Sequence, residues 1–97
     1  MDIEADVDDM EGNRAVAAIS KSVLDYLVSQ IVTDPEAVVI ETKEESPESV
    51  LFRLHVAPED MGRVIGRHGR VAQAIRTILR VAGDREGVKV SLDIVNE

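Results

Sequence analysis

The chain has 97 residues, and a hydrophobic content of 44% is enough for one small domain with a single core. It contains no cysteine, which excludes disulfides, zinc–thiolate sites and thiol nucleophiles. Lys and Arg number 11 against 19 Asp and Glu, and the formal net charge of −8 means that the molecule as a whole repels polyanions.

Residues 1–12 contain only acidic charges, and we expect them to form a disordered tail ahead of one folded domain at residues 13–97. The tail has two interpretations. It is a solvated extension that aids solubility, or a weak nucleic-acid mimic that folds back on an arginine-rich loop.

Asn13 is a plausible N-cap for a helix that runs from Arg14 to about Val32. Apolar residues recur there every three or four positions and predict one buried stripe. The stripe consists of Val16, Ile19, Val23, Leu27 and Ile31.

Two alternating segments follow and predict an antiparallel hairpin with its turn at residues 44–48, around Pro47. Val38, Ile40 and Thr42 share a face of the first strand, and Phe52, Leu54 and Val56 share a face of the second. Pro58 then starts a short helix, with Glu59 and Asp60 in its first turn.

A further helix is predicted from Arg70 to Ala82, with Gly83 as its stop, and a last strand from Val88 to Val95. The apolar face of that helix is predicted to contain Val71, Ala74, Ile75, Ile78, Leu79 and Ala82. The helical connection makes the second and last strands parallel, giving an α+β fold with a three-stranded mixed sheet and three helices on one face. The other face is expected to be exposed and to carry Glu41, Arg53, His55, Lys89 and Asp93.

The loop Gly66-Arg67-His68-Gly69 lies between two predicted helices. Its glycines permit a sharp turn and a close backbone approach, and its cations suit a sugar-phosphate chain. Residues 61–83 contain five arginines and no acid, so the remainder of the chain totals −13. The candidate nucleic-acid-binding residues are Arg63, Val64, Ile65, Gly66, Arg67, His68, Gly69 and Arg70. Arg76 and Arg80 are interpreted as solubilising residues.

Ile65-Gly66-Arg67-His68-Gly69, with Val71, Ala72 and Ile75 after it, resembles the core signature of a KH domain, and the element order α-β-β-α-α-β matches type II. More closely, residues 61–77 are similar to the small stand-alone bacterial KH-domain RNA-binding proteins of the KhpA type. The resemblance covers residues 14–95, essentially the whole predicted domain.

This resemblance implies a non-catalytic protein that binds single-stranded RNA, messenger or small regulatory, by clamping about four nucleotides with the GxxG loop. Ile65, with Val64 and Val71, would form an apolar floor, and a strand edge at Leu54 and Val56 would close the groove. It also implies an RNA chaperone or post-transcriptional regulator without cofactor, acting as a homodimer or as a heterodimer with a larger KH-containing protein.

The sequence departs from the commonest KH pattern in two places, the middle of the loop and the helix after it. Arg67 and His68 stand where a lysine is frequent, and Ala72 where a larger aliphatic is frequent. Because imidazoles titrate near pH 6.5, RNA binding strengthens on mild acidification if His68 contacts phosphate. Otherwise His68 is a tolerated exposed residue.

The alternative function is a protein-interaction module on a KH scaffold, which the intact, acid-free loop disfavours. An enzyme is set aside because no nucleophile is paired with a base, and the two histidines give no metal site. No apolar run approaches the roughly 20 residues of a bilayer span, and residues 1–11 do not resemble a signal peptide. We therefore expect a cytoplasmic protein without membrane contact.

Overall fold

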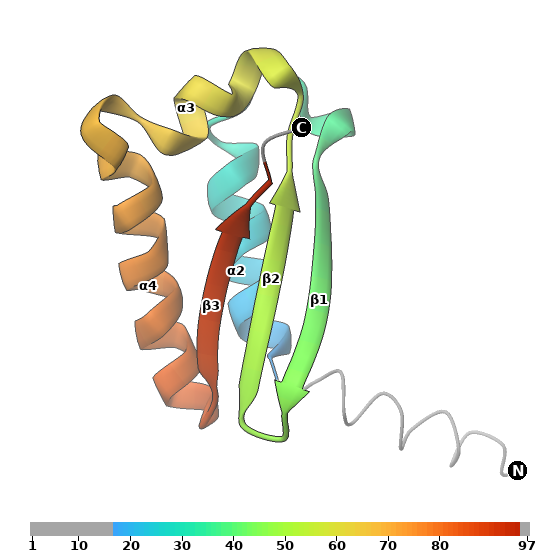
Figure 1. Cartoon of the computed structure of the whole chain (residues 1–97), viewed down its shortest axis with the longest axis vertical. Helices are drawn as coiled ribbons and strands as arrows, with labels where there is room; N and C mark the ends of the chain where they lie inside the picture. The colour runs from blue at the N-terminus through green and yellow to red at the C-terminus, as the bar shows by residue number, and fades with distance from the viewer. Residues whose placement is uncertain (1–16, 96–97) are drawn as a thin grey trace, which may run out of the picture.

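The computed structural model describes residues 17–95, and these follow the predicted order of helices and strands (Figure 1). The elements are α2 (Ala18–Ser29), β1 (Val39–Ser46), β2 (Ser49–His55), α3 (Met61–Ile65), α4 (Arg70–Glu86) and β3 (Lys89–Ile94). Single 3-10 turns occupy Pro35–Ala37, Pro58–Asp60 and Arg67–Gly69. The predicted tail, the Asn13 cap, the helix start at Arg14 and Val16 lie outside the described residues.

The sheet has the strand order β1-β2-β3, antiparallel between β1 and β2 and parallel between β2 and β3. The predicted mixed sheet is therefore confirmed. Strand β1 extends farther than predicted: Ser46 pairs with Ser49, which leaves only Pro47 and Glu48 in the turn. A bulge between Glu44 and Ser46 absorbs the extra residue.

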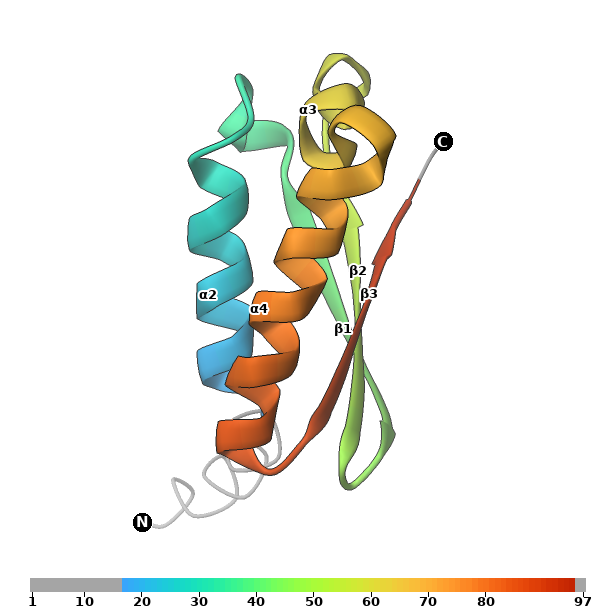
Figure 2. The same cartoon turned by 90° about the vertical axis from the view of Figure 1, so that its left-hand side faces the viewer.

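The helices in the described part of the chain lie on one side of the sheet (Figure 2). The core between the layers is built from Phe52 and Leu54 of the central strand together with Leu24, Val28 and Leu79 of the helices, all fully buried. The alternation of β2 predicted which of its residues enter this core, because successive side chains of a strand point to opposite faces.

The opposite face of the sheet is open and charged, as predicted. Arg53 pairs in register with Glu41 on one side and Asp93 on the other, and its Nε lies 3.5 Å from an Asp93 carboxylate oxygen. His55 Nε2 lies 3.0 Å from Glu41 Oε1. This hydrogen bond is the main reason that the pKa of Glu41 is below its ordinary value.

The buried stripe of α2 differs from the prediction. The fully buried residues are Ser20, Leu24 and Val28. Of the predicted stripe, Ile19 is 61% exposed, whereas the others in the described range are half-buried against the core: Val23, Leu27 and Ile31. The cause lies at the end of α4, where the Glu86 carboxylate accepts hydrogen bonds from the Ile19 and Ser20 amides at 3.0 and 2.9 Å. A residue 66 positions away thus caps the first turn of α2 and sets its rotation.

Helix α4 passes through Gly83, where it was predicted to stop, and ends at Gly87 in the left-handed conformation, with φ of 76°. Gly83 is buried against the start of β3, and a Cβ there would lie 2.7 Å from both the Val88 carbonyl oxygen and the Val90 side chain. The predicted apolar face is confirmed at Ile75 and Leu79 but is wrong at Ala74 and Ile78, which are exposed. The buried residues are Ala72, Ile75, Leu79 and Gly83.

Candidate nucleic-acid interface

The backbone between α3 and α4 departs from ordinary helical geometry at three residues, Gly66, His68 and Gly69. Gly66 has φ 77° and ψ 170°, a conformation that is essentially restricted to glycine. His68 and Gly69 follow with φ of 58° and 72°, both left-handed. Histidine is among the few side chains enriched in that region. We call residues 61–70 the α3–α4 corner.

The two loop glycines meet different surroundings. A Cβ on Gly66 would lie 2.3 Å from Val71 Cγ2 and 2.8 Å from the Val71 amide nitrogen. A Cβ on Gly69 would meet no atom within 4 Å. Gly66 is thus required both for its conformation and for space, whereas Gly69 is required for conformation alone.

The corner presents backbone donors at the start of the longest helix. Helix α4 begins at Arg70 and has no acidic residue in its first turn, so the partial positive charge of its N-terminus is not neutralised locally. Gly69 donates back to the Gly66 carbonyl at 3.1 Å, which closes the turn. A phosphate fits this combination of amide groups and helix dipole.

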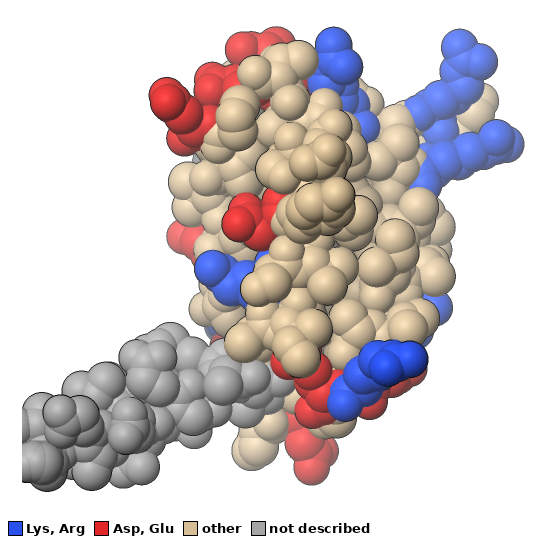
Figure 3. All heavy atoms as spheres, turned by 180° about the vertical axis from the view of Figure 1, so that it is seen from behind, with Lys and Arg blue, Asp and Glu red and all other residues tan. Residues whose placement is uncertain are grey.

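The corner also presents exposed cations. Arg67, His68 and Arg70 are exposed, and blue side chains project from this end of the molecule in Figure 3. Arg63 is exposed as well, but its Nε lies 3.7 Å from a carboxylate oxygen of the buried Asp60. Part of the Arg63 charge is therefore offset within the protein.

Asp60 fixes the corner to the loop that follows α2. Its Oδ1 accepts hydrogen bonds from the Thr33 amide at 3.0 Å and the Thr33 hydroxyl at 2.9 Å, and its Oδ2 accepts one from the Asp34 amide at 3.1 Å. The Thr33 amide is the largest cause that lowers the pKa of Asp60, and burial opposes it. The sequence placed Asp60 in a first helical turn but not in this tertiary contact.

The apolar residues proposed for the groove divide into two groups. Ile65 is 37% exposed and Val71 is half-buried, so both can offer surface beside the loop. Val64 and Leu54 are fully buried, so their side chains belong to the core beneath the corner rather than to its exposed surface. Strand β2 is also central, so the edge expected at Leu54 does not exist. The edge nearer α4 belongs to β3.

One residue that the sequence assigned to the solvent is part of this edge. Arg76 is half-buried, and its Nε donates a hydrogen bond to the Leu92 carbonyl oxygen of β3 at 3.3 Å. The periodicity of α4 gave no sign of it, because the helix is rotated from the predicted face. The contact places a guanidinium between α4 and the sheet.

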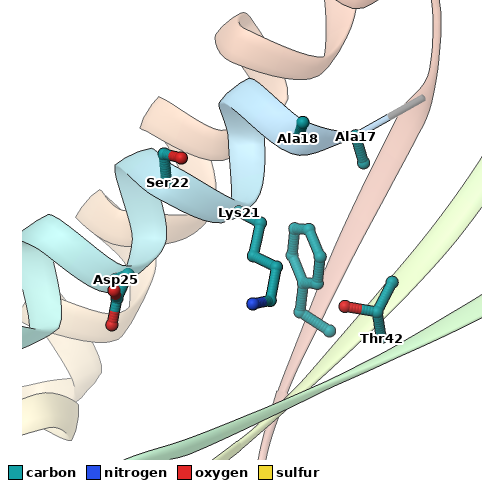
Figure 4. Close-up of a pocket in the computed structure, with 7 residues that line it drawn as sticks. Ala17, Ala18, Lys21, Ser22, Asp25 and Thr42 are labelled. Atoms are coloured by element: carbon teal, nitrogen blue, oxygen red, sulfur yellow. The ribbon is translucent and has the colours of Figure 1, made fainter. Parts of the chain in front are cut away.

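A separate hollow of about 370 Å³ lies between the start of α2 and the sheet (Figure 4). Lys21 of α2 and Thr42 of β1 line it from opposite sides, and Asp25 lies one helical turn farther along α2. Residues 17–95 contain no group of three or more His, Asp or Glu arranged to hold a metal ion. In the same range, no helix combines the length and hydrophobicity of a bilayer span.

Comparison with known proteins gives a consistent result. The family profile described as "KhpA/KhpB, KH domain" matches residues 21–94. A Listeria monocytogenes protein named RNA-binding protein KhpA is 46% identical over 69 residues, which are 71% of this chain and 90% of that protein.

More distant relatives carry the same name. The Clostridium perfringens protein is 39% identical over 75 residues, covering 77% of this chain and 99% of the relative. The Chlamydia trachomatis protein is 39% identical over 77 residues, which are 79% of this chain and 97% of that protein. No solved structure gave a significant match. The profile and the relatives confirm the resemblance seen in the loop and its flanks, and the chain belongs to the KhpA/KhpB family of KH domains.

Proposed function

We propose that this protein binds single-stranded RNA without catalysis, by holding the sugar-phosphate backbone at the Gly66–Gly69 loop. The observation that carries the proposal is the coincidence of three features at the α3–α4 corner: glycine-dependent backbone, the unneutralised N-terminus of α4 and exposed cations free of nearby loop acids. The names of the relatives support RNA as the ligand.

The residues of the loop and its immediate flanks have distinct roles in this proposal. The glycines bring backbone amides to the phosphates, Arg67 and Arg70 supply charge, and Ile65 with Val71 supports the bases. His68 adds a side chain that can hydrogen-bond a phosphate oxygen. Since few phosphates are contacted, binding is modest, which suits a cytoplasmic RNA chaperone or post-transcriptional regulator of messenger or small RNA.

A partner is the second part of the proposal. A hollow of about 600 Å³ between α2 and α4 is lined mainly by apolar side chains, and a largely uncharged surface crosses both helices in Figure 3. The exposed apolar residues of these helices are Ile19, Tyr26, Ile78 and Val81, which we call the α2–α4 face. Contiguous apolar surface favours association. A second copy, or a larger KH-containing protein, would cover this face and extend the short RNA site.

The test is fluorescence anisotropy with a pool of labelled single-stranded RNA. We expect the double variant Arg67→Asp/His68→Asp to lose binding, because it reverses the charge where phosphates are held. The control variant Lys21→Asp/Lys43→Asp reverses the charge at two exposed positions outside the corner and should retain RNA binding. Wild-type affinity should fall with salt with a slope of about −0.7 per phosphate neutralised. Equal binding by the loop variant, or none by any protein, would instead support a protein-interaction module.

A further inference from the structure

Strand β3 forms one edge of the sheet, and its backbone groups alternate between β2 and open space. The Lys89 amide donates to the Glu48 carbonyl at 2.7 Å, and the Val95 amide donates to the Leu54 carbonyl at 2.9 Å. Both odd-numbered residues thus face β2. Because the direction alternates along a strand, the amide and carbonyl of Leu92 face outward.

An outward carbonyl on a strand edge is a hydrogen-bond acceptor. Such an edge beside a GxxG loop can accept a bond from the amino group of a base laid along it. In this protein the Leu92 carbonyl already accepts the bond from Arg76 Nε. The bond engages one of the two lone pairs of this carbonyl, and it brings the other N–H groups of the guanidinium close to the same point of the edge.

Arg76 is also well placed relative to the loop. It follows Arg70, the first residue of α4, by six positions, which corresponds to about 9 Å along the helix axis. It is half-buried between α4 and β3, and the bond through Nε restricts the orientation of its planar group. A guanidinium held in this way presents fixed donors.

We propose that Arg76 places guanidinium donors at the β3 edge in front of the Leu92 carbonyl, beside the outward-facing Leu92 amide, and thereby selects bases that present two adjacent acceptors. This inference rests on the proposed RNA-binding function. Cytosine presents N3 and O2, and guanine presents N7 and O6. Adenine and uracil have no such pair on these edges, because a donor stands beside each acceptor. The groove consequently prefers cytosine and guanine.

A purely structural role is the competing explanation. Natural sheets cover their edges to prevent pairing with other chains, and Arg76 could serve only to satisfy Leu92. The two roles differ in what a substitution changes. Loss of an edge cover changes stability and association, whereas loss of a base contact changes the ratio of affinities for different bases.

The experiment measures the affinities of labelled octamers of cytidine, adenosine and uridine by anisotropy, with a uridine octamer carrying one central guanosine as a fourth ligand. We expect the wild type to bind the cytidine octamer at least about fivefold more tightly than the adenosine octamer. Arg76→Gln should bring this ratio close to one, since the guanidinium donors are then absent from the edge. The wild type should also bind the guanosine-containing octamer more tightly than the uridine octamer. This difference in affinity should disappear in Arg76→Gln.

Two further variants keep the result interpretable. Arg80→Gln removes an exposed arginine one turn farther along α4 and should leave the ratio unchanged. Arg76→Lys retains the charge without the planar fork, so it should lower the ratio while overall affinity holds. An unchanged ratio in both Arg76 variants, with RNA still bound, would overturn this inference alone. Failure of the wild type to bind any octamer would overturn the proposed function as well.

Discussion

The α3–α4 corner and the α2–α4 face differ in the part of the chain that forms them, which is the backbone in the corner and the side chains in the face. The corner depends on backbone conformations, with positive φ at Gly66, His68 and Gly69. The face depends on side chains, such as Ile19 and Ile78, that project from regular helices. One added methyl group can therefore destroy the corner, whereas the face is altered only by changing the chemistry of its surface. Substitutions can therefore disrupt either region while leaving the other intact.

The largest effect is expected from Gly66→Ala. Its Cβ would overlap Val71, and alanine does not adopt the Gly66 conformation, so we expect a loss of about 3 kcal/mol or more in unfolding free energy. RNA binding should be lost with it. Urea denaturation and anisotropy measure the two effects.

Gly69→Ala is the matched control. Its Cβ meets open space, so only the left-handed backbone is penalised, by about 1–2 kcal/mol. The folded variant should retain measurable RNA binding. If both alanine variants lost equal stability, the crowding at Val71 would not be what distinguishes the two glycines.

The α2–α4 face is tested by Ile78→Asp. Ile78 is 43% exposed, so a carboxylate there is tolerated in the monomer but desolvated in an assembly. We expect at least a tenfold weaker self-association, which is about 1.4 kcal/mol, by sedimentation velocity. RNA affinity of the monomer should be unchanged.

Val39→Asp is the corresponding control, because Val39 is 52% exposed but lies on β1, away from both helices. It should associate like the wild type. A wild type that is monomeric at high concentration, or equal weakening by both variants, would remove the α2–α4 face as the site of association.

The contrast between these regions also explains what the sequence could predict. Strand alternation has a period of two, so it identified the core residues Phe52 and Leu54 and the open face without ambiguity. The loop was visible because glycine spacing and charge are local properties. Its backbone conformation follows from the same residues.

The buried faces of α2 and α4 were harder to predict, because both helices have apolar residues on two adjacent stripes. The choice between the stripes depends on distant contacts: Glu86 on the first turn of α2, and Val88 and Val90 against Gly83. The same rotation brought Arg76 to β3. Gly83 was taken as a stop on its intrinsic propensity, but the space that its missing side chain leaves for β3 outweighs that cost.

The smallest effect concerns Asp60, which joins the corner to the end of α2. Its folded-state pKa is lowered, chiefly by the Thr33 amide, so its stabilising contribution is complete above the unfolded-state value near 3.9 and is lost as the pH falls through the lower folded-state value. We expect the Tm of the wild type to decrease in this acidic range. In Asp60→Asn the Tm should be lower at neutral pH and should decrease less on acidification.

Glu59→Gln is the control, because Glu59 is the exposed neighbour of Asp60 and carries the same charge. Thermal unfolding followed by circular dichroism at pH 7 and pH 3 compares the three proteins. If Glu59→Gln flattened the pH dependence as much as Asp60→Asn, the acid sensitivity would come from general charge at this end of the molecule. A response specific to Asp60 would show that the corner, although made of backbone, is held in place by one buried carboxylate.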